Sequence, residues 1–198
     1  MPYFASILAA ALVFAQAGEE PTIQSLFEAG KYQQVIDQVS ATEEPQPADV
    51  YLAGQSARKL DPPDLDAARE WFGRLADGDE NPWTFIGRSA SAVVDGDSNK
   101  ARADAQQAVQ LGPTEFYAQY QLGLAYAESR DYANAATTFE KATMMDPSFA
   151  YAHYYGGLSY YQVKRIDKMS NFFERFLKLA PDAPERPAIE ALMRSVRR

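Results

Sequence analysis

The side chains that most often carry out catalysis are scarce in this sequence. The chain of 198 residues contains one histidine, His153, and no cysteine. A cysteine–histidine nucleophile pair, a metal site built from several histidines and a disulfide framework all need more than this. Acidic pairs such as Glu43 and Glu44 lie in polar stretches. Two remote carboxylates could still form a hydrolytic site, but the sequence does not point to one. We expect no catalytic residues, no metal and no cofactor.

The chemistry that the sequence does offer is aromatic. Tyr117 and Tyr120 recur further along the chain as Tyr151 and Tyr154, with the same spacing within the pair. A ring with a hydroxyl group provides a large contact area at a low entropy cost, which suits the binding of another protein. The elements that carry these tyrosines must therefore repeat with the same period.

Prolines mark that period along the chain. Pro113, Pro147 and Pro181 are equally spaced, at the same interval that separates the two tyrosine pairs, and each ends an amphipathic segment. Apolar residues recur at three- and four-residue steps within the segments, which predicts pairs of helices that bury one another's apolar stripes. One pair cannot bury all of its apolar surface, so neighbouring pairs must stack. The predicted fold class is all-α, an array of antiparallel helix pairs.

The repeat resembles the tetratricopeptide repeat, which has the same period, about 34 residues, and the pattern W-x2-LG-x2-Y, then A-x3-F, then A and P. The match is strong over residues 116–149 and weaker over 150–183, where His153 takes the tryptophan position as a packed ring. The matching residues, expected to pack the helices, are Leu122, Gly123, Tyr126, Ala135, Phe139, Ala142, Pro147, Gly157, Tyr160, Phe173 and Pro181. The resemblance implies a right-handed superhelical α-solenoid.

About five units follow from this resemblance. They span residues 20–46, 47–81, 82–115, 116–149 and 150–183, so that the repeat domain covers 20–183. The unit at 82–115 is degenerate because Ala105 stands where the second helix should carry an aromatic residue. Residues 184–198 are predicted to form a C-terminal capping helix, since Ile189 and Met193 belong to one apolar stripe.

The resemblance also implies a binding surface. In the family, the first helices of successive repeats line a concave groove, and the same positions of each point into it. Carried over, those positions predict a protein-binding groove lined by Trp83, Ile86, Tyr117, Tyr120, Leu124, Tyr151, Tyr154, Leu158 and Tyr161. Members that hold a C-terminal carboxylate use Lys, Asn and Arg there, so the resemblance disfavours that ligand. The alternative is that these rings pack between repeats or against an N-terminal segment.

Residues 1–17 form a different kind of segment. The stretch Phe4–Phe14 is almost wholly apolar, and the small residues Ala15 and Ala17 precede Gly18. This pattern is typical of a secretory signal peptide, since a membrane span needs about 20 apolar residues. We therefore expect a periplasmic or secreted protein that is not integral to a membrane.

Charge narrows the class of partner. The formal net charge is −8, whereas nucleic-acid binding requires a dense basic face. We expect a non-catalytic scaffold in the periplasm or cell envelope that binds another protein or a peptide segment, and no nucleic acid. Two alternatives stay open: a self-associating structural module, which would be a homo-oligomer, and a cytoplasmic co-chaperone with an uncleaved N-terminal helix.

Processing of the leader is directly measurable. If Ala15-Gln16-Ala17 is a cleavage motif, the exported chain begins at Gly18. The intact mass of the protein recovered from its native host should match residues 18–198. A mature chain that retains Met1 or Pro2 would contradict export by this route.

Overall fold

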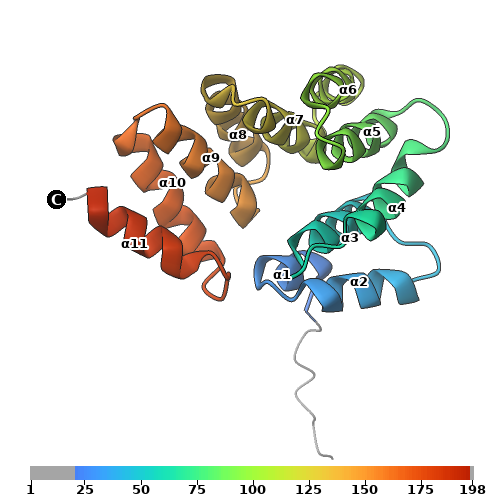
Figure 1. Cartoon of the computed structure of the whole chain (residues 1–198), viewed down its shortest axis with the longest axis horizontal. Helices are drawn as coiled ribbons and strands as arrows, with labels where there is room; N and C mark the ends of the chain where they lie inside the picture. The colour runs from blue at the N-terminus through green and yellow to red at the C-terminus, as the bar shows by residue number, and fades with distance from the viewer. Residues whose placement is uncertain (1–20, 197–198) are drawn as a thin grey trace, which may run out of the picture.

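The computed structural model describes residues 21–196, and this part of the chain is built from helices (Figure 1). The predicted signal peptide, residues 1–17, lies outside the described residues. The helices are α1 (Ile23–Glu28), α2 (Tyr32–Ala41), α3 (Pro47–Lys59), α4 (Leu65–Ala76), α5 (Pro82–Val94), α6 (Ser98–Leu111), α7 (Phe116–Glu128), α8 (Tyr132–Met145), α9 (Ala150–Gln162), α10 (Ile166–Leu179) and α11 (Arg186–Val196).

Consecutive helices pack on one another along the whole array. Each helix contacts the next one along the chain, from α1 to α11. The first helices of neighbouring pairs also touch, as α5 does with α7 and α7 with α9. Figure 1 shows the pairs stacked side by side in a curved array. The predicted all-α array of helix pairs is therefore confirmed.

The same turn joins the two helices of most pairs. Gly30, Gly96, Arg130 and Lys164 all have positive φ angles, between 59° and 74°. In each turn the residue that follows donates its N–H to a carbonyl in the preceding helix, as Asp131 does to Tyr126 at 2.9 Å. These left-handed residues satisfy carbonyls that the helix end would leave unpaired. The turn geometry therefore recurs with the period of the sequence.

Aspartates begin several of the second helices. A side-chain oxygen of Asp64, Asp97 and Asp131 accepts the N–H of the residue three positions later, at 2.9 to 3.3 Å. Such caps satisfy an otherwise unpaired backbone donor and are worth about 1 kcal/mol each.

A small residue against a phenylalanine ring sets the distance between the helices of a pair. Gly123 faces Phe139 and Gly157 faces Phe173, so closely that a Cβ atom would lie 2.6 and 2.5 Å from the respective rings. Both phenylalanines are fully buried. The rings fill the space that the missing side chains leave, as expected for close-packed helices.

The degenerate unit has two small residues at these two positions. Ala105 stands one repeat period before Phe139, and Ser89 stands one period before Gly123. Both Ala105 and Ser89 are fully buried, and the hydroxyl of Ser89 donates to the carbonyl of Ala101 at 2.7 Å. Because the ring is absent, the first helix can carry a polar side chain at this point of the core.

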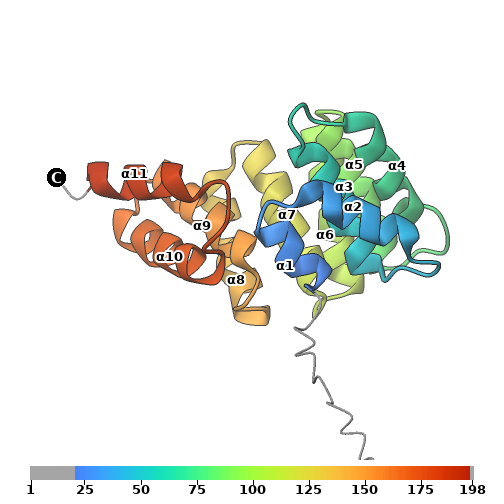
Figure 2. The same cartoon turned by 90° about the horizontal axis from the view of Figure 1, so that it is seen from below.

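The first unit folds back onto the fifth. The ring of Phe27 in α1 lies 4.9 Å from that of Tyr151 in α9, and the hydroxyls of Tyr32 and Tyr151 are 3.0 Å apart. The carboxylate of Glu28 accepts the N–H of Ala150, at the start of α9, at 2.7 Å. Figures 1 and 2 both place α1 beside the N-terminal end of α9.

An ion pair joins α3 of the second unit to the residue just before α11. Lys59 Nζ lies 2.6 Å from Glu185 Oε1, and both side chains are 18% exposed. Tyr151 donates its hydroxyl to Glu185 Oε2 at 2.8 Å, and Lys59 Nζ lies 4.4 Å from the centre of its ring. The array is thus closed on itself by a cation, a carboxylate and an aromatic ring.

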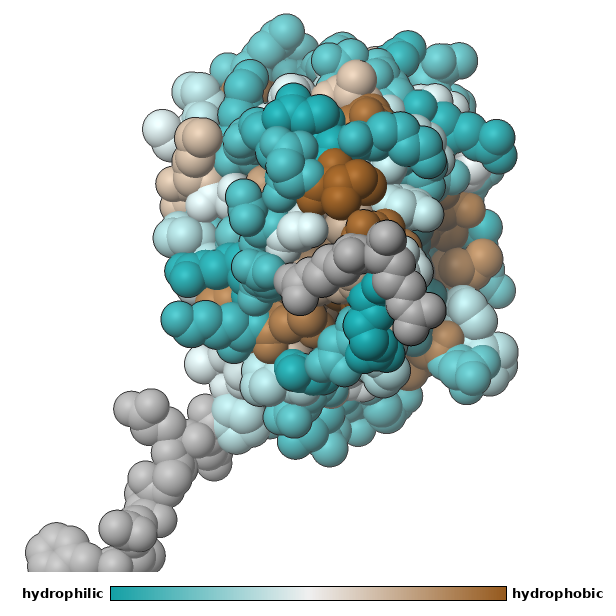
Figure 3. Space-filling model, turned by 90° about the vertical axis from the view of Figure 1, so that its left-hand side faces the viewer, coloured by the Kyte–Doolittle hydropathy of each residue, from teal (hydrophilic) through white to brown (hydrophobic). Residues whose placement is uncertain are grey.

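Helix α11 covers the C-terminal end. It buries Ile189 and Met193, and Arg186 pairs with Glu190 on its outer side at 2.9 Å. Figure 3, which views this end, shows a mostly hydrophilic face with separate small hydrophobic areas. Of the predicted segment 184–198, residues 197–198 lie outside the described part. Within residues 21–196, the helices are too short or too polar to cross a membrane.

Packing at the small residues gives a stability prediction. Gly157→Leu adds a side chain whose Cβ would lie 2.5 Å from the ring of Phe173, which is fully buried. Overpacking should therefore lower the free energy of unfolding by about 1–3 kcal/mol. Lys178→Ala, an exposed change on α10, is the control. Urea unfolding measures both midpoints. Equal midpoints would contradict this packing.

The contact between the first and fifth units predicts a pH effect. Burial raises the pKa of Glu28 from 4.5 to about 7. The folded state therefore binds the proton more tightly than the unfolded chain, and stability should fall as the pH rises from about 4.5 to about 7.

Removing the carboxyl group tests this effect. Glu28→Gln should flatten the pH dependence of the free energy of unfolding, measured by urea unfolding, by on the order of 2 kcal/mol over this window. Glu43→Gln, a change in an exposed loop, should keep the slope of the natural protein. The same slope in Glu28→Gln and the natural protein would show that Glu28 does not cause it.

Candidate functional site

All the predicted groove residues except Tyr161 fall into two groups according to their place along the first helices. Trp83, Tyr117 and Tyr151 lie in the first turns of α5, α7 and α9, whereas Leu124 and Leu158 lie in the second halves of α7 and α9. The first group belongs to an aromatic cluster in the core. The second lines an open pocket, in which Leu158 is half-buried and Leu124, 9% exposed, also belongs to that core. The concave face is therefore closed at one end of the helices and open at the other.

At the closed end, the structure differs from the predicted groove. Ile86, Tyr120 and Tyr151 are at most 2% exposed, so their expected surface position is wrong. Trp83, Tyr117 and Tyr154 are half-buried against the same core. The alternative, that the rings pack between repeats and against an N-terminal segment, describes these residues better.

Rings from neighbouring units cause this burial. Phe149, just before α9, lies 5.0 Å from Phe116, 5.8 Å from Tyr117 and 5.1 Å from Tyr120. The ring of Phe27 from α1 packs against that of Tyr151. Such contacts at tilted and edge-on angles are favourable for aromatic rings, and they fill the groove where the N-terminal ends of the first helices meet.

Tyr161, the last predicted groove residue, lies apart from both groups. It is half-buried and packs against the cluster of the last unit and α11. The ammonium group of Lys164 is 5.2 Å from the centre of its ring.

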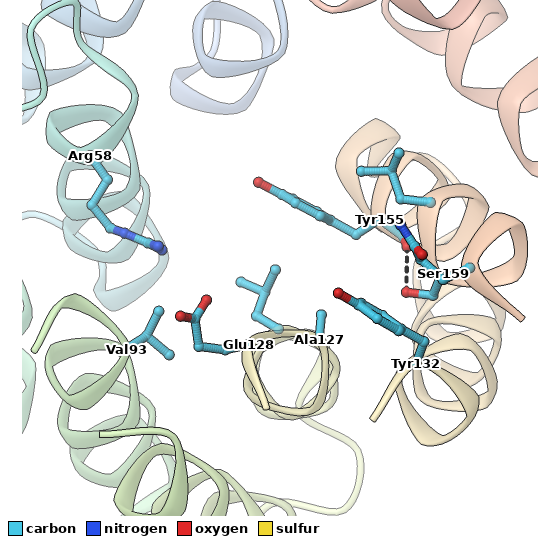
Figure 4. Close-up of a pocket in the computed structure, with 10 residues that line it drawn as sticks. Arg58, Val93, Ala127, Glu128, Tyr132, Tyr155 and Ser159 are labelled. Carbon is cyan, nitrogen blue, oxygen red and sulfur yellow. Dashed lines mark hydrogen bonds between the residues drawn. The ribbon is translucent and has the colours of Figure 1, made fainter. Parts of the chain in front are cut away.

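At the open end, the C-terminal halves of four first helices surround a pocket of about 290 Å³ (Figure 4). The residues that line it are Arg58, Val93, Leu124, Ala127, Glu128, Tyr132, Tyr155, Leu158, Ser159 and Gln162. They come from α3, α5, α7 and α9, with Tyr132 from α8. The pocket thus spans four consecutive units.

The pocket is apolar with a charged edge. Leu124, Ala127 and Leu158 supply side-chain carbon surface, and Tyr155 extends into the space toward the helix of Arg58 (Figure 4). Arg58 is half-buried and Glu128 is exposed. The hydroxyl of Ser159 already donates to the carbonyl of Tyr155 at 2.8 Å. An apolar pocket with a few polar groups is the usual form of a ligand site.

Arg58 is a site residue that the sequence reasoning missed. If Gly54 is aligned with Gly123, then Tyr51, Gln55 and Arg58 take the same places in α3 as Tyr120, Leu124 and Ala127 in α7. The longer turn that contains Asp61–Pro62 hides this register. Carrying the groove positions one unit upstream would have found Arg58.

The structure places the other chemistry-bearing residues away from this pocket. His153 is 8% exposed, its Nε2 lies 3.1 Å from the carbonyl oxygen of Pro147, and burial lowers its pKa. Its ring is 5.7 Å from that of Phe172, in keeping with a packed ring. In the part of the chain from 21 to 196, no three His, Cys, Asp or Glu side chains gather in a way that could hold a metal ion.

Comparisons with known proteins agree with this architecture. A family profile described as tetratricopeptide repeat matches residues 89–150 and 120–184. No curated protein sequence gives a significant match.

Among solved structures, the chain is similar to that of MamA, at 19% identity and a TM-score of 0.50 over 76% of this chain and 85% of that one. A second similar structure is that of YrrB, described as a TPR protein with an unusual peptide-binding site. The identity is 21% and the TM-score 0.50, over 81% of this chain and 84% of YrrB. A third is that of the APC/C hetero-tetramer Cut9–Hcn1. The identity is 17% and the TM-score 0.57, over 84% of this chain and 34% of the matched chain. At these identities the likeness concerns the fold. The helix-pair array, the period of its sequence and the family match together identify the chain as a tetratricopeptide repeat protein.

Proposed function

We propose that this protein is a non-catalytic scaffold that binds a peptide segment of another protein in the open half of its concave face. The observation that carries the proposal is the pocket shared by α3, α5, α7 and α9. Tetratricopeptide repeat proteins bind peptides or proteins, and a surface built from four units suits an elongated ligand.

The size of the pocket supports a peptide rather than a folded domain. About 290 Å³ lies just below the range of about 300–1,000 Å³ for ligand sites. Such a space accepts one or two side chains, while the rest of a peptide lies along the helices. Of the predicted groove residues, Leu124 and Leu158 make the proposed contact, together with Tyr155.

The proposed place of action is the periplasm or the outside of the cell. The support is the composition of residues 1–17, an apolar run followed by small residues. The partner is then another protein of the cell envelope.

Filling the pocket tests the binding proposal. Ala127 is half-buried on the pocket wall, so Ala127→Trp should place an indole in the space and lower partner binding at least about tenfold. The readout is recovery of crosslinked partners from a native envelope extract, with circular dichroism and urea unfolding as checks of the fold.

Met144→Trp provides the matched control, because Met144 is 76% exposed on α8 and does not line the pocket. It should recover the same partners as the natural protein. Recovery of every partner by a folded Ala127→Trp variant would place the binding surface elsewhere.

A further inference from the structure

A series of hydrogen bonds between buried side chains ends at the pocket. Arg58 Nη1 donates to Gln55 Oε1 at 3.1 Å, and Gln55 Nε2 donates to the hydroxyl of Tyr51 at 2.8 Å. That hydroxyl donates to Gln121 Oε1 at 2.7 Å. Gln121 Nε2 then donates to Ser89 Oγ at 3.0 Å, and Ser89 donates to a backbone carbonyl in α6.

Every member of this series donates in the same direction. Tyr51, Gln55, Gln121 and Ser89 are at most 5% exposed, so each polar group needs a partner inside the protein. Since the hydroxyl of Ser89 is committed to a carbonyl, the amides of Gln121 and Gln55 are oriented in turn. Gln55 must therefore present its oxygen to Arg58, which holds the guanidinium at the pocket edge.

The guanidinium has binding capacity left. An arginine carries five N–H donors in a planar fork, and Gln55 takes one of them. Among the residues from 21 to 196, no carboxylate forms an ion pair with Arg58. Arg58 is also the only cation among the described residues that line the pocket. A half-buried cation beside an apolar space is complementary to an anionic group on a ligand.

We propose, building on the proposed function, that the pocket binds an extended partner segment carrying an apolar side chain and an Asp or Glu two residues away. The apolar side chain packs against Leu124 and Leu158, and the carboxylate accepts hydrogen bonds from Arg58. Side chains two residues apart lie on the same side of an extended chain, which lets one segment reach both places.

The geometry favours an acidic side chain over the carboxylate of a chain end. Figure 4 shows Arg58 on one side of the pocket and the residues of α9 on the opposite side. Within one C-terminal residue the carboxylate and the side chain share one Cα atom, so that residue alone cannot supply both contacts across the pocket. Two separate side chains can do so, and Glu128 at the rim can accept a backbone N–H of the segment.

Selection from a displayed library of random 12-residue peptides, fused at both ends, tests the preference. The natural protein should enrich peptides with Asp or Glu two residues from Leu, Ile, Phe or Met. One enriched peptide is then synthesised with acetyl and amide ends, together with its Asp→Asn or Glu→Gln form. A selection without acidic enrichment overturns the proposal.

Binding of these two peptides is measured by fluorescence anisotropy. Arg58→Gln should weaken binding of the acidic peptide at least about tenfold and leave binding of the neutral peptide unchanged. The two peptides should then bind this variant with the same affinity. The affinity of Arg58→Lys for the acidic peptide should lie between those of the natural protein and Arg58→Gln, because the lysine ammonium keeps the charge but not the planar fork of donors. Arg88→Gln, which removes a half-buried arginine of α5 outside the pocket, should match the natural protein.

The outcomes separate this inference from the proposed function. If folded Arg58→Gln keeps the natural preference for the acidic peptide, Arg58 is not the recognition residue. If peptides bind only with a free C-terminal carboxylate, the assignment to an acidic side chain is overturned. In either case loss of binding in Ala127→Trp would still support the pocket. Full binding in Ala127→Trp would overturn both.

Discussion

The contact between a small residue of each first helix and the residue facing it in the second helix is the constraint on which this structure depends. Where the small residue is Gly123 or Gly157, the space is filled by a phenylalanine ring. Where the second helix offers only Ala105, the first helix carries Ser89. A close-packed interior tolerates neither a void nor an added atom. Where the ring is missing, the side chain of Gln121 lies against Ser89 instead, with its Nε2 3.0 Å from the serine Oγ.

The serine at this position has a consequence at the surface. Ser89 brings a hydroxyl into the core, and a buried hydroxyl must be hydrogen-bonded. The hydroxyl donates to the carbonyl of Ala101 and accepts a hydrogen bond from Gln121 of α7. Gln121 in turn accepts from Tyr51 of α3, and Tyr51 accepts from Gln55, which accepts from Arg58. A unit that departs from the repeat pattern in the interior thus fixes the position of a cation at the edge of the pocket. Ser89 in the core and Arg58 at the pocket therefore belong to one hydrogen-bond network.

The return of the first unit onto the fifth determines which part of the concave face stays open. Phe27 and Tyr32 cover Tyr151, and Lys59 pairs with Glu185 in front of the same ring. These contacts bury the ring of Tyr151 at the start of α9, while Phe149 covers the rings at the start of α7. The C-terminal halves of the first helices, where smaller and aliphatic side chains stand, remain available around the pocket.

Sequence by itself determined the elements and their order. The spacing of Pro113, Pro147 and Pro181 and the small residues facing rings predict the helix pairs, because these signals act within one unit of the chain. Burial of Ile86, Tyr120 and Tyr151 and the exposure of the pocket were decided only by the tertiary structure. These properties depend on contacts such as that between Glu28 and Ala150, 122 residues apart. A local pattern shows which face of a helix is concave, but not which distant segment will cover it.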